Sequence, residues 1–350
     1  MLYSKARAFG VIESTGNSET RARKFMRAST LSLPELQTLT KALTWVFRKN
    51  GCGNTPVSVL NRQLVAGIGS FHSEIVTCRF ANGQKRRLFC KFGSAPRHRH
   101  PTVRHGIAYE AAVYRHVLRR FSVPTPTYYG IYSDRVRGRV CLVLEYLRNT
   151  EPVEFVSEYA AAMRRAAQWL GQFHRCQEVH LPPSAGRVLN RYDCGYYRRW
   201  LRQASAQAVH LRRRHPWFPQ VCRRYEQWID LLIPSTTFIH GDLVSGHLLV
   251  GDGKIFIIDW DLAALAVGEI DLANLTWGWG SVIRGECELA YERARWPEKT
   301  APADFRLRLA AARLYLEFRW LGEDDDTEDA EPLSARLEKL GTLARRLKII

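Results

Sequence analysis

The chain has 350 residues, of which 46% are hydrophobic and 25% are charged. A chain of this size and composition can bury at least one full core, so we expect one large domain or two lobes and exclude a mainly disordered protein. No stretch has the roughly 18 uncharged apolar residues that a membrane span requires. Residues 1–32 contain no apolar segment like that of a signal peptide. We therefore expect neither a transmembrane protein nor a secreted one.

The eight cysteines are scattered along the chain and form no C-x-x-C pair and no metal-binding spacing. This usage is typical of reduced thiols, so we expect a cytoplasmic protein. The formal net charge is +18 at pH 7 and comes mostly from arginine. Such a charge favours polyanionic surfaces or substrates, but it does not indicate a fold.

The first half of the chain shows mainly strand patterns after a polar, aperiodic tail at residues 1–32. A helix is predicted from Leu33-Pro34 to about residue 50, because apolar residues recur there at helical spacing. Short β-rich segments follow, with Asn82-Gly83 as a two-residue hairpin signal. The predicted strands are 57–64, 74–80, 87–91, 128–132 and 140–146, with one helix at 108–121.

Helical patterns dominate from residue 151 onward, interrupted by one β cluster at 238–261. The predicted helices include 160–176, 196–213 and 219–232, and the acidic run 323–331 is interpreted as a solvated loop. The fold class predicted is α+β, with a β-rich N-lobe and a mostly helical C-lobe. We expect a flexible tail at 1–32, an N-lobe at 33–147 and a C-lobe at 148–350.

The β cluster contains the residues most indicative of chemistry. Apolar strands flank a polar loop that contains Asp242, turn back through Asp252-Gly253, and the second strand ends on Asp259. A hairpin of this kind can direct both carboxylates to one cleft. Phosphoryl transfer needs one carboxylate to accept a proton from the attacking hydroxyl and another to hold the metal that neutralises the phosphates.

This segment resembles the aminoglycoside phosphotransferase family, kinases of small-molecule hydroxyls that share the protein-kinase-like fold. The resemblance rests on H-G-D at 240–242, D-W-D at 259–261 and D-L-A at 271–273. It implies a two-lobed kinase fold, with ATP and Mg²⁺ as cofactors. It also implies that Asp242 is the catalytic base, that His240 supports the catalytic loop, that Asp259 is the chief magnesium ligand and that Asp271 is structural.

The resemblance extends from about residue 57 to residue 273 and supplies matching parts in the N-lobe. Lys91 resembles the strand lysine that grips the α and β phosphates, and Glu110 resembles its helix-borne partner. A glycine loop is expected to cover the nucleotide, and the backbone of a hinge strand is expected to meet the adenine. These cofactor-binding residues are Gly67, Gly69, Ser70, Glu145 and Leu147.

Two departures from the family pattern stand out. Position 247 is His where the family usually has Asn as the second metal ligand, although hard Mg²⁺ prefers oxygen. Macrolide phosphotransferases and lipopolysaccharide heptose kinases look similar in having His at this position, and we predict that His247 contacts metal or phosphate. Residues 266–267 are Ala-Val where many members have Gly-Asp.

The segment 187–224 combines many arginines with tyrosine and tryptophan and contains almost no acids. In the family, this region commonly shapes the acceptor site. A pocket for polycationic aminoglycosides should be acidic, so the arginines disfavour such an acceptor. They suit a phosphorylated sugar, an anionic lipid head group or a carbohydrate face, or they form a solvated basic surface.

The first hypothesis is therefore an ATP-dependent phosphotransferase acting on a hydroxyl of a small molecule that is sugar-like, an antibiotic or a metabolite. A kinase of lipopolysaccharide-core or lipid-linked sugars, peripheral to an anionic inner membrane face, is the alternative acceptor class. A catalytically degenerate nucleotide-binding pseudokinase is a second hypothesis. Nucleic-acid binding rests on charge alone and is disfavoured, and the sequence predicts no oligomeric state.

Overall fold

The chain forms two compact units in the computed structural model, which describes residues 33–49, 56–65, 71–94, 106–134, 136–180, 185–211, 213–234, 236–323 and 332–350. Unit 1 comprises Met1–Ser157 and Gly246–Leu262, and unit 2 comprises Glu158–Ser245 and Ala263–Ile350. The sequence places the lobe boundary between residues 147 and 148. In the structure, the boundary lies ten residues later, after Ser157, and unit 1 also includes the segment Gly246–Leu262.

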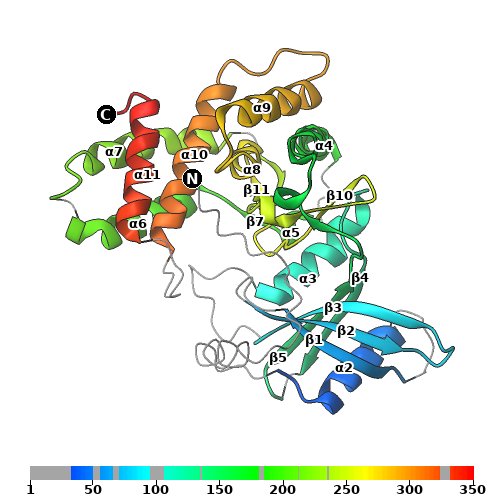
Figure 1. Cartoon of the computed structure of the whole chain (residues 1–350). Helices are drawn as coiled ribbons and strands as arrows, with labels where there is room; N and C mark the ends of the chain where they lie inside the picture. Colours follow the sequence, from blue (N-terminus) through cyan, green and yellow to red (C-terminus); the bar gives the residue numbers. More distant parts are fainter. Residues whose placement is uncertain are drawn as a thin grey trace. The chain divides into compact units, whose positions relative to one another are not determined.

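Unit 1 is built on a five-stranded antiparallel sheet (Figure 1). The strand order is β1 (Ser58–Val65), β2 (His72–Arg79), β3 (Lys85–Ser94), β5 (Arg139–Glu145) and β4 (Tyr128–Asp134). The predicted hairpin at Asn82-Gly83 is confirmed, although its loop has three residues, since Phe80 N–H donates to Gln84 O. Gly83 has a φ of +77°, the left-handed conformation that ends such a loop.

Two helices pack on opposite faces of this sheet (Figure 1). Helix α2 (Leu36–Lys49) buries its apolar side against one face, where its Leu43 and Phe47 join Leu88, Cys90 and other alternate strand residues in one core cluster. Lys91 is out of phase with Leu88 and Cys90 and therefore points to the other face. Helix α3 (Gly106–His116), which contacts Lys91 through Glu110, lies on that face.

A second, three-stranded sheet of unit 1 joins sequence-distant segments in the order β10 (Lys254–Ile257), β9 (Leu248–Gly251) and β6 (Glu151–Pro152). The expected turn at Asp252-Gly253 is confirmed. Gly251 pairs with Lys254, and Asp252 and Gly253 both have positive φ, at +50° and +72°. This geometry matches the right-handed twist of the strands and places Asp259 two residues beyond β10.

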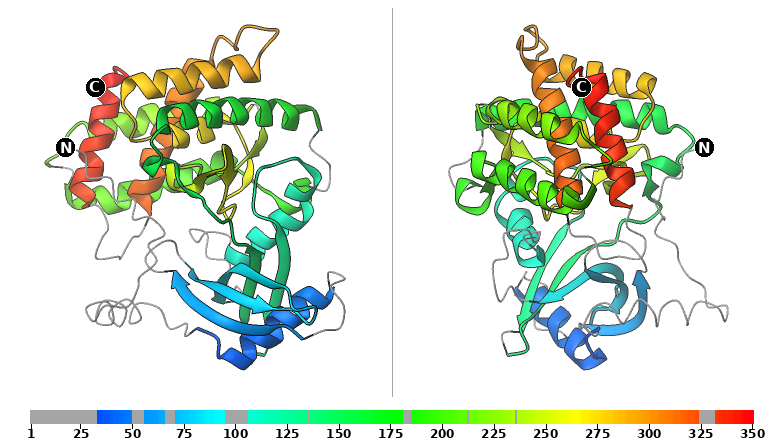
Figure 2. Two further views of the ribbon diagram at one scale, coloured as in Figure 1. Left: turned by 45° about the vertical axis from the view of Figure 1, so that its right-hand side comes forward. Right: turned by 90° about the vertical axis from the view of Figure 1, so that its left-hand side faces the viewer.

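Unit 2 is mostly helical, with helices α4 (Tyr159–His180), α5 (Ala185–Val188), α6 (Cys194–Gln207), α7 (Phe218–Trp228), α8 (Glu269–Leu275), α9 (Ser281–Arg295), α10 (Phe305–Gly322) and α11 (Leu333–Arg346). A small sheet of β7 (Asn190–Arg191), β11 (Ala264–Ala266) and β8 (Thr237–Ile239) completes it. Helices α4 and α9 run side by side (Figure 2). They meet closely at Gly171, where a Cβ would lie 2.5 Å from Tyr291 O.

Helix α10 is buried on nearly all sides, unlike the amphipathic helices around it. Its few buried charged residues include Arg308 and Arg319. In the part of the chain that the structure describes, no helix combines the length and the apolar character that crossing a membrane would require.

Candidate active site

In unit 1, the predicted nucleotide-binding lysine lies between two carboxylates. Lys91 Nζ is 2.9 Å from Glu110 Oε2 and 2.7 Å from Asp259 Oδ1. Lys91 and Glu110 are both buried. Burial alone would lower the pKa of Lys91, but Asp259 and Glu110 raise it above its usual range. The lysine is therefore a fixed cation within strand β3.

The other oxygen of Asp259 faces an imidazole. His247 Nε2 is 3.4 Å from Asp259 Oδ2, and the carbonyl of His247 accepts a hydrogen bond of 3.1 Å from Ile258 N–H. Asp259 has a φ of +67°, so its backbone adopts the left-handed region that non-glycine residues rarely occupy. The Asp259 carboxylate therefore lies between Lys91, which contacts Oδ1, and His247, which contacts Oδ2.

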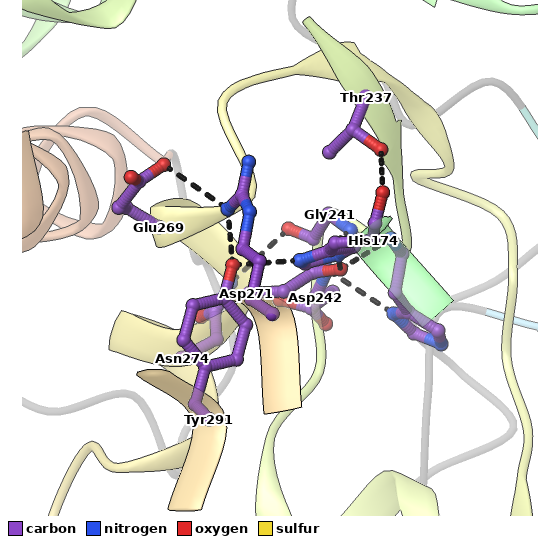
Figure 3. Close-up of polar contacts among 10 residues, drawn as sticks. His174, Thr237, Gly241, Asp242, Glu269, Asp271, Asn274 and Tyr291 are labelled. Carbon is purple, nitrogen blue, oxygen red and sulfur yellow. Dashed lines mark hydrogen bonds and ion pairs between the residues drawn. The ribbon is translucent and has the colours of Figure 1, made fainter. Parts of the chain in front are cut away.

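In unit 2, the H-G-D loop is held by the carboxylate of Asp271 on helix α8. The backbone N–H groups of His240 and Gly241 donate to Asp271 Oδ2 and Oδ1 at 2.7 and 2.8 Å (Figure 3). Gly241 has a φ of +83°, a conformation that glycine adopts without strain. His240 Nδ1 in turn accepts from the backbone N–H of Asp242 at 3.2 Å. Asp271 and His240 therefore fix the loop that contains Asp242.

A buried network of hydrogen-bonded side chains continues behind Asp271. His174 Nε2 is 3.3 Å from Asp271 Oδ2, and His174 Nδ1 is 2.9 Å from Tyr291 Oη (Figure 3). Burial lowers the pKa of His174, although Asp271 opposes the shift. A neutral ring with its proton on Nε2 donates to Asp271 and accepts from Tyr291, whose hydroxyl itself accepts from Arg295. Asp271, His174 and Tyr291 therefore meet with complementary donors and acceptors.

The sequence did not predict Arg319, which contacts Asp242 directly. Arg319 Nη1 lies 3.1 Å from Asp242 Oδ1 and 3.1 Å from Gly241 O, and Arg319 Nε donates to Glu323 Oε1 at 3.0 Å. Arg319 is 2% exposed. Burial alone would lower its pKa, but Glu323 and Asp242 raise it well above the usual value. The available signal was that Arg319 continues the apolar row of Ala312, Tyr315 and Leu316 at helical spacing, because buried arginines are almost always paired.

Comparison with known proteins gives the family. Residues 76–305 match the model of the phosphotransferase enzyme family. The chain belongs to this family. It is thus an enzyme, a small-molecule phosphotransferase with a kinase-like fold. No curated protein is similar enough in sequence to count as a match.

Solved structures of phosphotransferases share the fold with this chain. The GDP complex of an aminoglycoside 2'-phosphotransferase-IIIa has a TM-score of 0.60 at 14% identity, covering 87% of this chain and 98% of that one. Spectinomycin phosphotransferase with ADP and spectinomycin has a TM-score of 0.57 at 13% identity, covering 91% and 100%. A macrolide 2'-phosphotransferase type I has a TM-score of 0.55 at 16% identity, covering 89% and 99%.

The remaining predicted site residues of this phosphotransferase are placed as follows. The Glu145 carboxylate accepts hydrogen bonds from the N–H and the Oγ1 hydroxyl of Thr127 at 3.0 and 2.6 Å, and Leu147 is half-buried. Asp242 belongs to unit 2, whereas Lys91 and Asp259 belong to unit 1. The glycine-loop residues lie outside the described residues; they are Gly67, Gly69 and Ser70.

The aromatic residues and the arginines of segment 187–224 of the phosphotransferase lie in different environments. Its aromatic rings pack inward: Tyr192 and Tyr196 stack at 3.8 Å, and the hydroxyls of Tyr196 and Tyr315 are 2.9 Å apart. Most of its arginines are exposed, and Arg198 pairs with Glu226 at 2.6 Å. Tyr315 precedes Arg319 by one helical turn on α10, so the aromatic cluster lies beside the arginine that holds Asp242.

Proposed function

We propose that this enzyme transfers the γ-phosphate of ATP to a hydroxyl group of a small molecule. The observation that carries the proposal is the contact of Lys91 with both Glu110 and Asp259. In kinases, this combination positions the nucleotide phosphates beside the metal-binding carboxylate. Two of the structural neighbours are complexes with GDP and ADP, which supports a nucleotide as phosphoryl donor.

Asp242 would accept the proton of the attacking hydroxyl. Its backbone N–H donates to His240, and its carboxylate contacts the cation of Arg319, so both ends of the residue are restrained. A restrained base lowers the entropic cost of reaching the reactive geometry. Arg319 would act as a positioning residue that holds Asp242 in place.

Magnesium fits one of the two predicted ligands better than the other. When bound, Mg²⁺ would neutralise the charge of the transferred phosphates, and the Asp259 carboxylate has the hard oxygen donors that it prefers. Within the described residues, no group of three or more His, Cys, Asp or Glu side chains forms a complete metal cage. Phosphate oxygens and water commonly complete such a site. His247 would orient Asp259 through Nε2 and serve as a ligand only for softer metals.

The acceptor would be neutral or anionic. The exposed arginines of segment 187–224 disfavour a polycationic aminoglycoside. One structural neighbour is a macrolide phosphotransferase, which makes sugar-bearing antibiotics a reasonable part of an acceptor screen. Sugars linked to an anionic membrane surface form the second acceptor class, and phosphorylation that requires anionic vesicles would favour them.

The test is a comparison of Asp242→Asn with Asp230→Asn, an exposed carboxylate of the same unit. ATP or GTP turnover is measured against a panel of sugars and antibiotics, and Mg²⁺-dependent nucleotide binding is measured in parallel. We expect Asp242→Asn to abolish turnover with nucleotide affinity unchanged, and Asp230→Asn to behave as the parent. Turnover that persists in Asp242→Asn would refute the assignment. Nucleotide binding without turnover on any acceptor would favour the pseudokinase.

A further inference from the structure

Unit 1 contains a pocket of about 350 Å³ beside the chain that leaves strand β5. This volume lies within the range of small-molecule sites. Residues from the start of β3, from the segment after β5 and from the β9–β10 turn line it. They include Lys85, Arg86, Arg87, Tyr129, Glu145, Tyr146, Arg148, Asp252, Lys254 and Phe256. We call this hollow the basic pocket.

The lining of the basic pocket carries an excess of positive charge. Five of its side chains are basic, and only Glu145 and Asp252 are acidic. The Glu145 carboxylate is occupied by the N–H and hydroxyl of Thr127. Within the described ranges, none of the five basic side chains forms an ion pair with a carboxylate; they are Lys85, Arg86, Arg87, Arg148 and Lys254. Their mutual repulsion would be relieved by an anion in the hollow.

The basic pocket is separate from the Lys91–Asp259 cluster. Along β3, Lys85 and Arg87 share the phase of Lys91, whereas Arg86 shares that of Leu88 and Cys90 and lies on the sheet face that packs against α2. Tyr129 packs on Phe47 of α2 and belongs to the same face. Neither Lys91 nor Asp259 lines the pocket, and the three lining residues of β3 all precede Lys91 by at least four positions.

Two of the guanidinium groups are held by aromatic rings. Arg87 stacks 4.1 Å over the ring of Tyr146, and Arg86 lies 5.2 Å from the ring of Phe80. A stacked guanidinium keeps its planar set of donors and loses little freedom when it binds a phosphate in bidentate fashion. Tyr129 and Phe256 add aromatic surface to the lining, which suits a compact ring bearing the phosphates.

We propose that the basic pocket binds a small molecule that carries two or more phosphate groups. Several cations around one hollow match clustered phosphates on a compact molecule better than the extended backbone of a nucleic acid. The phosphates can belong to a soluble phosphorylated metabolite or to a lipid head group, which share this chemistry. Because Glu145 to Arg148 form one wall, such a ligand would restrain the segment whose backbone is predicted to meet the adenine.

The test uses the full-length protein with inositol hexakisphosphate and inorganic tripolyphosphate as probes, and saturating ADP to fill the predicted nucleotide site. The triple variant Arg87→Gln, Arg148→Gln, Lys254→Gln removes three pocket cations. The matched control removes three exposed cations of the same unit outside the pocket, in the triple variant Lys41→Gln, Arg79→Gln, Arg119→Gln. We expect the pocket variant to bind at least one probe about tenfold or more weakly, and the control to change by less than about twofold.

Equal weakening in the two triple variants would overturn the proposal, since it would show a response to net charge alone. Absence of binding of both probes to the parent protein would also overturn it. If the pocket variant fails to fold, the single substitution of exposed Arg148→Gln replaces it, with Arg79→Gln as control. A competition experiment distinguishes a lipid ligand from a soluble one. Binding to vesicles that contain a phosphoinositide bisphosphate is compared with binding to its soluble head group. Stronger binding to the vesicles indicates a lipid, and equal or stronger binding to the head group indicates a soluble ligand. In either case, binding should weaken in the pocket variant.

Discussion

Arg319 Nη1 lies 3.1 Å from Asp242 Oδ1, so a buried arginine of helix α10 holds the carboxylate of the H-G-D loop. The same guanidinium also bonds to Gly241 O and to Glu323. This contact ties the loop to the C-terminal helices of unit 2. It supplies a countercharge for a carboxylate that is only 5% exposed.

Replacing Arg319 should slow catalysis more than it weakens nucleotide binding. We expect Arg319→Met to lower kcat about a hundredfold, because a misplaced base costs rate at this scale. We also expect a loss of about 3–5 kcal/mol in the free energy of unfolding, since Asp242 loses its buried partner. Arg319→Lys should recover part of the lost kcat and part of the lost free energy of unfolding. Arg313→Met, on the same helix and paired with Glu288, is the control. A proportional fall in nucleotide affinity would count against a positioning role.

Lys91→Ala should weaken nucleotide binding. The variant removes the cation between Glu110 and Asp259, and with it the predicted bonds to phosphate, so we expect an affinity about ten- to a hundredfold lower. Titration calorimetry with ADP and Mg²⁺ measures the effect, and exposed Lys41→Ala on α2 serves as control. Unchanged affinity in a folded Lys91→Ala protein would argue that the nucleotide binds elsewhere.

His247→Asn should change the metal requirement. The amide oxygen of asparagine suits Mg²⁺ better than imidazole does, so we expect half-maximal activity at an Mg²⁺ concentration lower by about tenfold. Any activity supported by an imidazole-binding metal such as Ni²⁺, relative to Mg²⁺, should fall in the same variant. His116→Asn, an exposed histidine at the end of α3, is the comparison. An unchanged metal response in His247→Asn would show that position 247 has no part in metal binding.

His174 should contribute to the pH dependence of stability. Burial lowers the pKa of His174 in the folded protein, so at pH values below about 6.5 the unfolded chain binds a proton that the native ring does not. The free energy of unfolding should therefore fall as the pH drops from 6.5 towards the lowered pKa of the folded protein. His174→Gln should flatten this part of the profile, whereas exposed His210→Gln should not. Urea unfolding at several pH values provides the measurement, and an equally steep profile in His174→Gln would contradict the expectation.

Local patterns predicted much of unit 1. Strand alternation and the Asn82-Gly83 and Asp252-Gly253 turns depend on neighbouring residues, so the sequence is sufficient for them. The pairing of β6 with β9 was not predicted, because a strand of only Glu151 and Pro152 has no periodicity. Arg319 was missed for a related reason. It lies 78 residues after Gly241, and its partners become neighbours only when the helices pack.

The family resemblance supplied the predicted roles of Asp242, Asp259 and Lys91, which composition alone could not. The aromatic residues of segment 187–224 were interpreted as part of an acceptor surface, and much of this aromatic surface is buried packing. Tyr197 and Trp200, for example, are buried. A sequence cannot separate these uses, because tyrosine and tryptophan occur both in cores and at binding sites.

The contact of Arg319 with Asp242 also has a consequence for biosynthesis. The ribosome completes the H-G-D loop well before helix α10, which begins at Phe305. A nascent chain that ends before this helix holds Asp242 without its buried cation and exposes the apolar surface that α10 covers. Stable closure of unit 2 around the loop should therefore occur late in synthesis, after residue 319 has left the exit tunnel. Chains truncated before that point are expected to be prone to aggregation and proteolysis.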